Sequence, residues 1–209
     1  MSQKWIQKFE DIGMIWKHDG NPKRPYARLT SGKISNGFVN CTHLISRPNM
    51  LHEALKDLVG PYKIPRTPFV VVGQAMGSIT IASHAALILG GRSCWSVKVN
   101  NEAMQIDPRF ALDASVPAII VEDVTTSGGT TLKTKRALEH LGVPLLPYIF
   151  TVVNRSGKTH ADDLEIRALV TLDIKVWDFG ENPFTKDGME LVEPVRPKEH
   201  WEALRQEYA

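Results

Sequence analysis

Five short apolar runs recur along the chain, and none of them alternates strictly between apolar and polar residues. They are FVVVG at 69–73, CWSVKV at 94–99, PAIIVE at 117–122, PYIFTVV at 147–153 and ALVTL at 168–172. Strands of this kind, rich in valine and isoleucine, are covered on both faces in a folded protein. This feature constrains the fold most, because a sheet buried on both faces needs covering layers on each side.

Helical patterns stand between several of these runs. Residues 49–59, 78–89 and 130–141 carry apolar side chains at helical spacing, and Gly142 follows the last of them as a helix-ending residue. Alternation of strands and helices predicts an α/β domain with a mainly parallel sheet. Further short helices are expected over residues 1–13 and 201–208.

The chain length of 209 residues fits one domain that spans residues 1–209. Residues 20–47 and 177–200 stand outside the alternation and are expected to be additions that cover the top of the sheet. Residues 100–115 separate two strands without a helical period. We expect them to form a long loop that is functional or mobile.

Composition removes several classes of function. A net charge of +2 indicates neither nucleic acid nor membrane as a partner, and the apolar stretch at 79–89 is too short to cross a bilayer. Cys41 and Cys94 lack the spacing of a disulfide framework or a zinc site. Charges interrupt the N-terminal segment, so we expect no signal peptide and a cytoplasmic location.

The stretch AIIVEDVTTSGGT at 118–130 carries the chemistry. Its strand is expected to end at Glu122 and Asp123, at the carboxyl edge of the sheet where ligands of such sheets bind. Two carboxylates there suit the neighbouring hydroxyls of a ribose. The following loop, with Gly128 and Gly129, leads into a helix whose N-terminal N–H groups suit a phosphate. Together these features describe a site for a 5-phosphoribosyl group.

This stretch resembles the phosphoribosyl-diphosphate signature of type I phosphoribosyltransferases, and other segments extend the resemblance to orotate phosphoribosyltransferases. The segments are LTSGKISNGFVN (29–40), VVVGQAMGSITIA (70–82), VVNRSG (152–157) and WDFGENPFTKDGMELVEPV (177–195). They resemble, in order, the family's hood motif, its diphosphate loop, its orotate-binding strand and its C-terminal tail. The family fold implied is a mainly parallel sheet flanked by helices, with a small hood from the N-terminal segment and tail.

The resemblance implies a role for each matching residue. Catalytic roles fall to Asp123 and Lys98. Phosphoribosyl diphosphate would be bound by Glu122, Asp123, Val124, Thr125, Thr126, Ser127, Gly128, Gly129, Thr130, Gly73, Ala75, Gly77 and Arg109. Orotate would contact Thr126, Arg155, Phe38 and Lys33. Magnesium (Mg2+) would arrive with the substrate, with Glu122 and Asp123 as possible ligands, and a homodimer without nucleic-acid or membrane partners is implied.

Three departures from the family pattern remove positive charge near the diphosphate. The loop before the acidic strand offers only Lys98 and Arg109, the diphosphate loop has Gln74 in place of the usual proline and no lysine, and Thr30 replaces a lysine of some members. Two alternatives to orotate transfer therefore stay open. One is a phosphoribosyltransferase for another base, and the other is a non-catalytic phosphoribosyl-diphosphate-binding regulatory protein.

Overall fold

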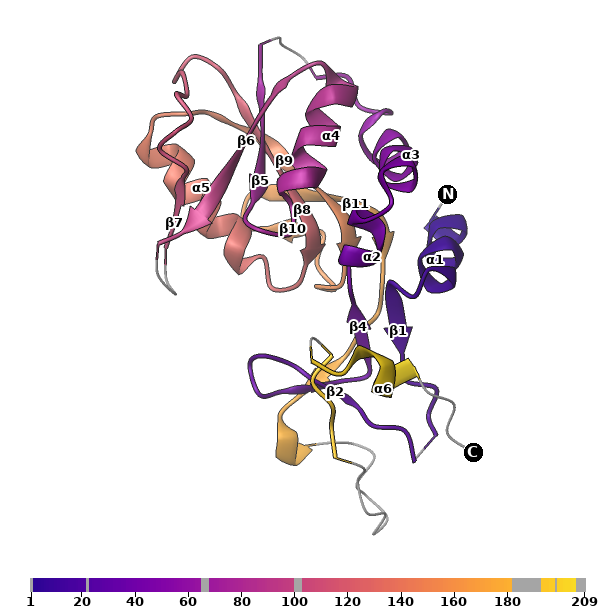
Figure 1. Ribbon diagram of the computed structural model, residues 1–209. Helices are drawn as coiled ribbons and strands as arrows, with labels where there is room; N and C mark the ends of the chain where they lie inside the picture. The colour runs from indigo at the N-terminus through magenta and orange to yellow at the C-terminus, as the bar shows by residue number, and fades with distance from the viewer. Residues whose placement is uncertain are drawn as a thin grey trace. The chain divides into compact units, whose positions relative to one another are not determined.

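The five apolar runs all become strands of one sheet, which has seven strands within the described residues (Figure 1). The computed structural model describes residues 2–21, 23–64, 68–99, 103–181, 193–197 and 199–205. The strands from the predicted runs are β5 (Val70–Gln74), β6 (Arg92–Lys98), β8 (Ala118–Thr125), β9 (Leu145–Asn154) and β11 (Leu164–Thr171). They pair in parallel, which confirms the predicted α/β class. Two antiparallel edge strands complete the sheet, β7 (Met104–Ile106) and β10 (His160–Ala161).

The order of the strands places a ligand crevice between β5 and β8. The sheet runs β10-β11-β9-β8-β5-β6-β7. The chain starts in the middle at β5, steps to β6 on one side, and then returns across β5 to continue through β8, β9 and β11. Such a reversal separates the loops that follow the two central strands, and open α/β sheets bind ligands at this switch point.

Helices cover both faces of the sheet because the chain crosses it in opposite directions. The helices are α3 (Pro48–Val59), α4 (Ile79–Leu89) and α5 (Gly129–His140). Right-handed crossovers place α4, between β5 and β6, and α5, between β8 and β9, on opposite faces. Leu138 of α5 packs with Val70, Val72 and Ile120, while α3 packs against α4. No helix among the described residues is both long and apolar enough to span a membrane.

Gly73 is required by the close approach of α4 to β5. A Cβ atom at this position would lie 2.4 Å from the backbone oxygen of Ser78 and 2.9 Å from Cβ of Ala82. We expect Gly73→Ala to lower the free energy of unfolding by about 1–3 kcal/mol, the usual range for an overpacked core. Urea denaturation would measure the loss, and Gly180→Ala, where a Cβ meets no atom within 4 Å, is the matched control. Equal stability of both variants would contradict the close packing.

Two expectations about loops are wrong. The acidic strand does not end at Glu122, because Val124 and Thr125 continue the ladder with Val153 and Asn154 of β9. The segment 100–115 is not simply a loop, because β7 pairs with β6 inside it. Main-chain pairing with a neighbouring strand extends both elements beyond what the local apolar pattern indicates. Residues 100–102, the centre of the predicted loop, lie outside the described residues.

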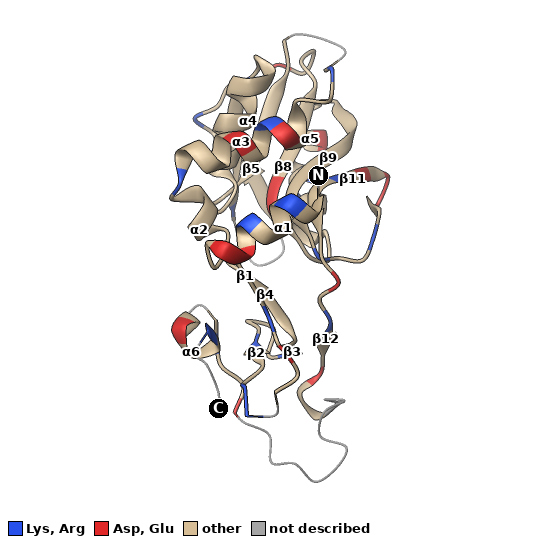
Figure 2. Ribbon diagram, turned by 90° about the vertical axis from the view of Figure 1, so that its right-hand side faces the viewer, with Lys and Arg blue, Asp and Glu red and all other residues tan. Residues whose placement is uncertain are grey.

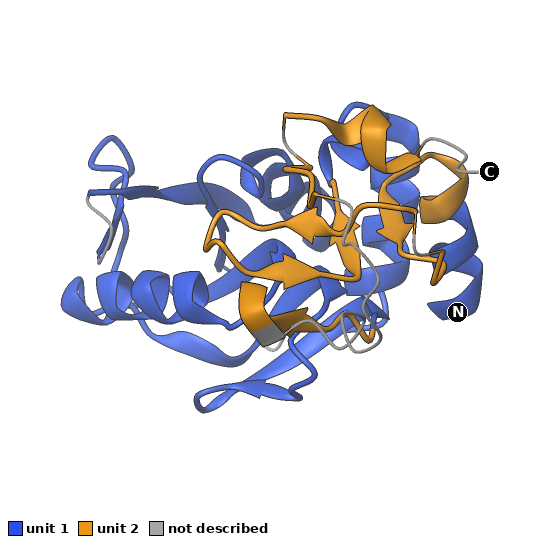
Figure 3. Ribbon diagram, turned by 90° about the horizontal axis from the view of Figure 1, so that it is seen from below, with its two compact units in different colours: residues 1–8, 41–172 blue, residues 9–40, 173–209 orange. Residues whose placement is uncertain are grey.

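Residues 9–40 and 173–209 form a second compact unit, here called unit 2, whereas residues 1–8 and 41–172 form unit 1 (Figure 3). Unit 2 thus contains most of both predicted additions, although its bounds are wider. The remaining helices of the described residues, in both units, are α1 (Ser2–Asp11), α2 (Thr42–Ile45), η1 (Phe179–Glu181) and α6 (Trp201–Arg205). The short strands are β1 (Ile15–Lys17), β2 (Ala27–Arg28), β3 (Ile34–Ser35), β4 (Gly37–Val39) and β12 (Val176–Trp177).

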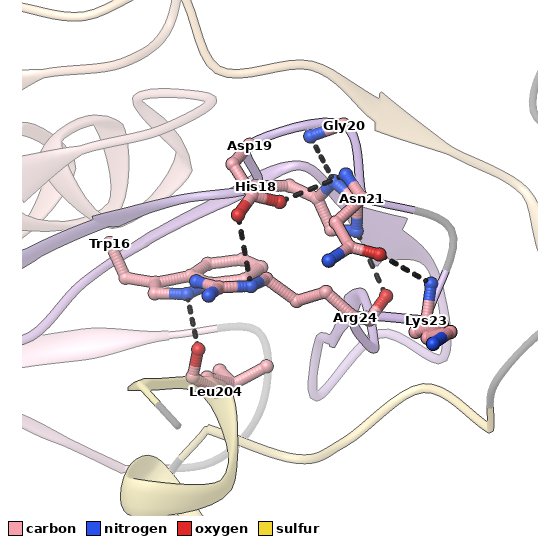
Figure 4. A network of polar contacts seen from close by, with 8 residues as sticks. All are labelled: Trp16, His18, Asp19, Gly20, Asn21, Lys23, Arg24 and Leu204. Atoms are coloured by element: carbon pink, nitrogen blue, oxygen red, sulfur yellow. Dashed lines mark hydrogen bonds and ion pairs between the residues drawn. The ribbon is translucent and has the colours of Figure 1, made fainter. Parts of the chain in front are cut away.

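Unit 2 joins segments from both ends of the sequence through a small core and a polar network (Figure 4). The indole N–H of Trp16 donates to the backbone oxygen of Leu204 at 2.7 Å. Gly20 N–H donates to Nδ1 of His18 at 3.0 Å, and Nε2 of the same ring lies 2.9 Å from the backbone oxygen of Arg24. The ring must therefore carry its proton on Nε2, and it holds the turn over residues 18–24 in one shape.

Candidate active site

A cavity of about 190 Å³ lies at the switch point between β5 and β8. Its walls are the loop that follows β5, the end of β8 and the beginning of α5. The lining residues are Gln74, Ala75, Gly77, Ser78, Glu122, Asp123, Val124, Thr126, Gly128, Gly129 and Thr130. Nine of these eleven belong to the predicted phosphoribosyl-diphosphate set, the exceptions being Gln74 and Ser78. Tertiary structure thus brings together two motifs that lie far apart in the sequence.

The N-terminus of α5 forms one wall and presents backbone N–H groups. Gly128, the residue before the helix, has a φ of +79°, a backbone conformation that glycine adopts without strain. Ser127 Oγ accepts a hydrogen bond from Gly129 N–H at 3.4 Å. The first turn of any helix carries N–H groups outside the internal ladder and the positive end of the helix dipole. This wall can therefore bind a phosphate.

Asp123 presents a partly exposed carboxylate to the cavity. Its Oδ1 accepts from Val124 N–H at 2.9 Å and from Ser78 Oγ at 3.4 Å. Its own N–H donates to Ser78 Oγ at 3.0 Å. A Cβ at Gly77 would lie 2.4 Å from Oδ2, so a larger residue there would displace the Asp123 carboxylate. These contacts hold Asp123 at the cavity, where a sugar hydroxyl can reach it.

Glu122 is in a different environment, with only 4% of its surface exposed. Its Oε1 accepts from Gln74 Nε2 at 2.8 Å and from the hydroxyl of Thr131, and its Oε2 accepts from Thr125 Oγ1 at 2.7 Å. Burial raises the pKa of this carboxyl group, although the three donors act in the opposite direction. Figure 2 shows the acidic positions of β8 in red within the sheet. The two neighbouring acids therefore differ in exposure and in partners.

Arg155 lies directly after β9, beside the start of the phosphate loop. Its backbone N–H donates to the backbone oxygen of Thr125 at 2.9 Å. The guanidinium is partly buried, and burial lowers its pKa. Among the residues that the structure describes, no acid pairs with it. A cation in such a position favours an anionic ligand group.

Two residues predicted to contact orotate lie in unit 2. Lys33 pairs with Asp178, with 3.0 Å between Nζ and Oδ1. Phe38 packs against Trp201, with ring centroids 5.7 Å apart, and lines a cavity of about 220 Å³ with Arg28 and other residues. Their predicted roles toward orotate stay predictions.

The two basic residues predicted near the diphosphate are placed differently by the sheet. Lys98 ends β6 and is exposed at the carboxyl edge, two residues beyond the pairing of Ser96 with Gln74. Arg109 follows β7, which runs back along β6 toward its amino end. Its guanidinium holds Asp107 through contacts of 2.9 and 2.6 Å, which lower the pKa of that carboxyl group. The register therefore places Arg109 toward the amino end of β6, and its predicted diphosphate contact stays a prediction.

Three residues that support the site were missed in the sequence: Gln74, Ser78 and Thr131. Gln74 is 7% exposed, and Ser78 and Thr131 are buried. A glutamine that closes an apolar strand does carry a signal, because a buried amide must find a hydrogen-bond partner. The partner itself lies 48 positions away and is visible only in the fold.

The fold is that of the type I phosphoribosyltransferases. Orotate phosphoribosyltransferase from Aeropyrum pernix superimposes with a TM-score of 0.63 at 20% identity, over 79% of this chain and 92% of that chain. Adenine phosphoribosyltransferase from Rhodothermus marinus superimposes with a TM-score of 0.55 at 18% identity, over 65% and 86% of the two chains. Because enzymes for different bases share it, the fold does not identify the base.

Sequence similarity points to one branch of this class. The orotate phosphoribosyltransferase of Caldanaerobacter subterraneus is 29% identical over 92% of this chain and 96% of its own length. That of Desulforamulus reducens is 27% identical over 88% of this chain and 95% of its own length. No protein-family model matches the chain. The resemblance to orotate phosphoribosyltransferases that the motifs indicated is confirmed over nearly the whole chain.

Proposed function

We propose that this chain is an enzyme of pyrimidine nucleotide biosynthesis. It transfers the 5-phosphoribosyl group from phosphoribosyl diphosphate to orotate, which gives orotidine 5′-phosphate and diphosphate. The observation that carries this proposal is the switch-point cavity, where Asp123 and the N-terminus of α5 converge. Similarity to orotate phosphoribosyltransferases over 88–92% of the chain supports the choice of reaction.

Each wall of the cavity has a part in this reaction. The loop from Thr126 to Thr130 binds the 5-phosphate, Asp123 binds ribose hydroxyls, and the loop from Ala75 to Gly77 approaches the diphosphate through its backbone. As the bond to diphosphate breaks, the sugar passes through an oxocarbenium-like state. Binding groups held in place before the reaction stabilise the developing charge, and exclusion of water protects the cation.

Arg155 supports orotate over an uncharged base. Orotate carries a carboxylate that can accept two hydrogen bonds from a guanidinium, whereas uracil and adenine carry none. An uncharged base would leave the partly buried cation unpaired. A regulatory protein that only senses phosphoribosyl diphosphate would have no need of this residue. Neither alternative is favoured.

Magnesium fits this site as a companion of the substrate. Within the described ranges, no group of three or more His, Cys, Asp or Glu side chains is arranged to hold a metal ion. Magnesium commonly binds through one or two carboxylates together with substrate oxygens and water. Asp123 would supply such a carboxylate, and the ion would neutralise charge on the diphosphate.

The resemblance to orotate phosphoribosyltransferases, which are commonly two-fold dimers, supports a homodimer. We propose a cytoplasmic homodimer that acts on small molecules, and light scattering at several concentrations tests the dimer.

The activity itself is tested directly. The protein is incubated with orotate and phosphoribosyl diphosphate, with and without magnesium, and orotidine 5′-phosphate is separated and quantified. We expect product with orotate and little with uracil, adenine or hypoxanthine. A better acceptor among these three bases would replace orotate as the substrate, and no turnover of any base together with tight phosphoribosyl-diphosphate binding would favour the regulatory alternative.

A further inference from the structure

A side-chain bridge joins β5 and β8 just beyond the point where their main chains stop pairing. The parallel ladder between the two strands runs from Val70 with Ala118 to Gly73 with Val121. At the next position Gln74 Nε2 donates to Glu122 Oε1 at 2.8 Å. The bridge therefore spans the opening between the strands at the base of the cavity.

Glu122 also binds the two segments that follow β8. Its remaining acceptor positions take the hydroxyl of Thr125, at the end of β8, and the hydroxyl of Thr131, in the first turn of α5. Both threonines are fully buried. One carboxylate thus connects the diphosphate loop, the start of the phosphate loop and the helix that forms the phosphate-binding wall.

Both acids line the cavity, but their carboxylates are engaged differently. Three donors enclose the Glu122 carboxylate, and a buried carboxylate needs such donors because it has lost its water. A ribose hydroxyl would have to displace one of them. Asp123 is partly exposed and borders the same cavity, so a hydroxyl reaches it without that displacement.

We propose that Gln74 and Glu122 are a positioning pair, which fixes the diphosphate loop relative to the phosphate loop. This inference rests on the proposed function, because it concerns binding of phosphoribosyl diphosphate. Two substrate ends must be held at once for the reaction, and a small displacement of one wall misplaces the bond that breaks. Gln74, which stands where the family usually has proline, thus acquires a role.

The test exchanges the amide and the carboxylate between positions 74 and 122. This distinguishes a positioning role of Glu122 from its direct contact with ribose. Gln74→Met keeps the length of the side chain but removes the amide donor, and Gln74→Glu opposes two carboxylates. Gln74→Glu combined with Glu122→Gln restores a carboxylate–amide pair with the partners reversed. Gln105→Met, on an exposed position of β7, is the matched control.

The readouts are calorimetric titration with phosphoribosyl diphosphate and magnesium, steady-state kinetics and thermal unfolding. We expect Gln74→Met to weaken phosphoribosyl-diphosphate binding about tenfold, the lower end of the range for groups that orient a ligand-binding side chain. Its KM for orotate should change far less. Gln74→Glu should lose more, and the exchange should recover most of the loss. Gln105→Met should behave like the parent.

Three outcomes would overturn the positioning pair. One is unchanged binding in Gln74→Met with a normal unfolding temperature. Another is a reciprocal exchange that binds no better than Gln74→Glu while it unfolds at the parent temperature, because that result indicates direct contact of Glu122 with ribose. The third is a parent protein that binds no phosphoribosyl diphosphate. A parent that binds it but does not use orotate would refute only the proposed base, because calorimetry still measures the pair.

Discussion

Replacement of Arg155 by alanine is expected to weaken orotate binding by about 2–4 kcal/mol, the scale of two charge-assisted hydrogen bonds. The guanidinium is partly buried beside the phosphate loop, and no acid pairs with it among the described residues. Since no acid of the described chain depends on this side chain, its loss should appear in ligand binding. Phosphoribosyl-diphosphate affinity should stay nearly unchanged, because Asp123 and the α5 N-terminus remain.

Steady-state kinetics with each substrate varied in turn measures this effect, and Arg136→Ala, on an exposed position of α5, is the matched control. The parent should use uracil poorly, because uracil leaves the cation unpaired. The Arg155→Ala variant should discriminate less between orotate and uracil. Equal use of orotate by the variant and the parent would remove Arg155 as the group that selects the base.

Asp123→Asn is expected to weaken phosphoribosyl-diphosphate binding by about 1.5–3 kcal/mol, the value of one hydrogen bond to a charged group. The substitution keeps the shape of the side chain and removes the charge that a ribose hydroxyl or a magnesium ion would contact. The fold should be retained, because the side chain is partly exposed and Ser78 can still bond to the amide oxygen.

Calorimetry with magnesium and phosphoribosyl diphosphate measures the loss, and Asp173→Asn, at an exposed position, controls for the change in net charge. Thermal unfolding of the variant should match that of the parent. If Asp123→Asn bound phosphoribosyl diphosphate with the parent's affinity, the ribose would have to lie elsewhere in the cavity.

The structure gives different surroundings to the residues that the family pattern places around the diphosphate. Gln74 is occupied by its bond to Glu122 and contributes to the shape of the site. Arg109 is paired with Asp107. Lys98 remains the basic residue at the carboxyl edge of β6. Because the segment from the end of β6 to β8 offers only Lys98 and Arg109 as basic residues, we expect slow turnover in the assay.

The α/β class and the phosphoribosyl site were accessible from the sequence because both depend on local patterns. Non-alternating Val and Ile runs require burial on both faces, and the pattern of residues 118–130 carries strand, acids, loop and helix start in one continuous stretch. The cavity lies where that stretch and the loop after β5 meet. The α/β class and the phosphate loop follow from the spacing of residues along the chain, which can be read in the sequence.

Only the tertiary structure shows how Glu122 and Asp123 differ in burial and in hydrogen-bond partners. As neighbours in the sequence, Glu122 and Asp123 look equivalent, but alternate positions on a strand face opposite sides of the sheet. Both line the cavity, but Gln74 and Thr131 enclose the Glu122 carboxylate, so Glu122 is buried, whereas Asp123 is partly exposed. The extension of β8 to Thr125 likewise depends on β9 as its neighbour. Such partners are distant in the sequence, and only tertiary structure brings them into contact.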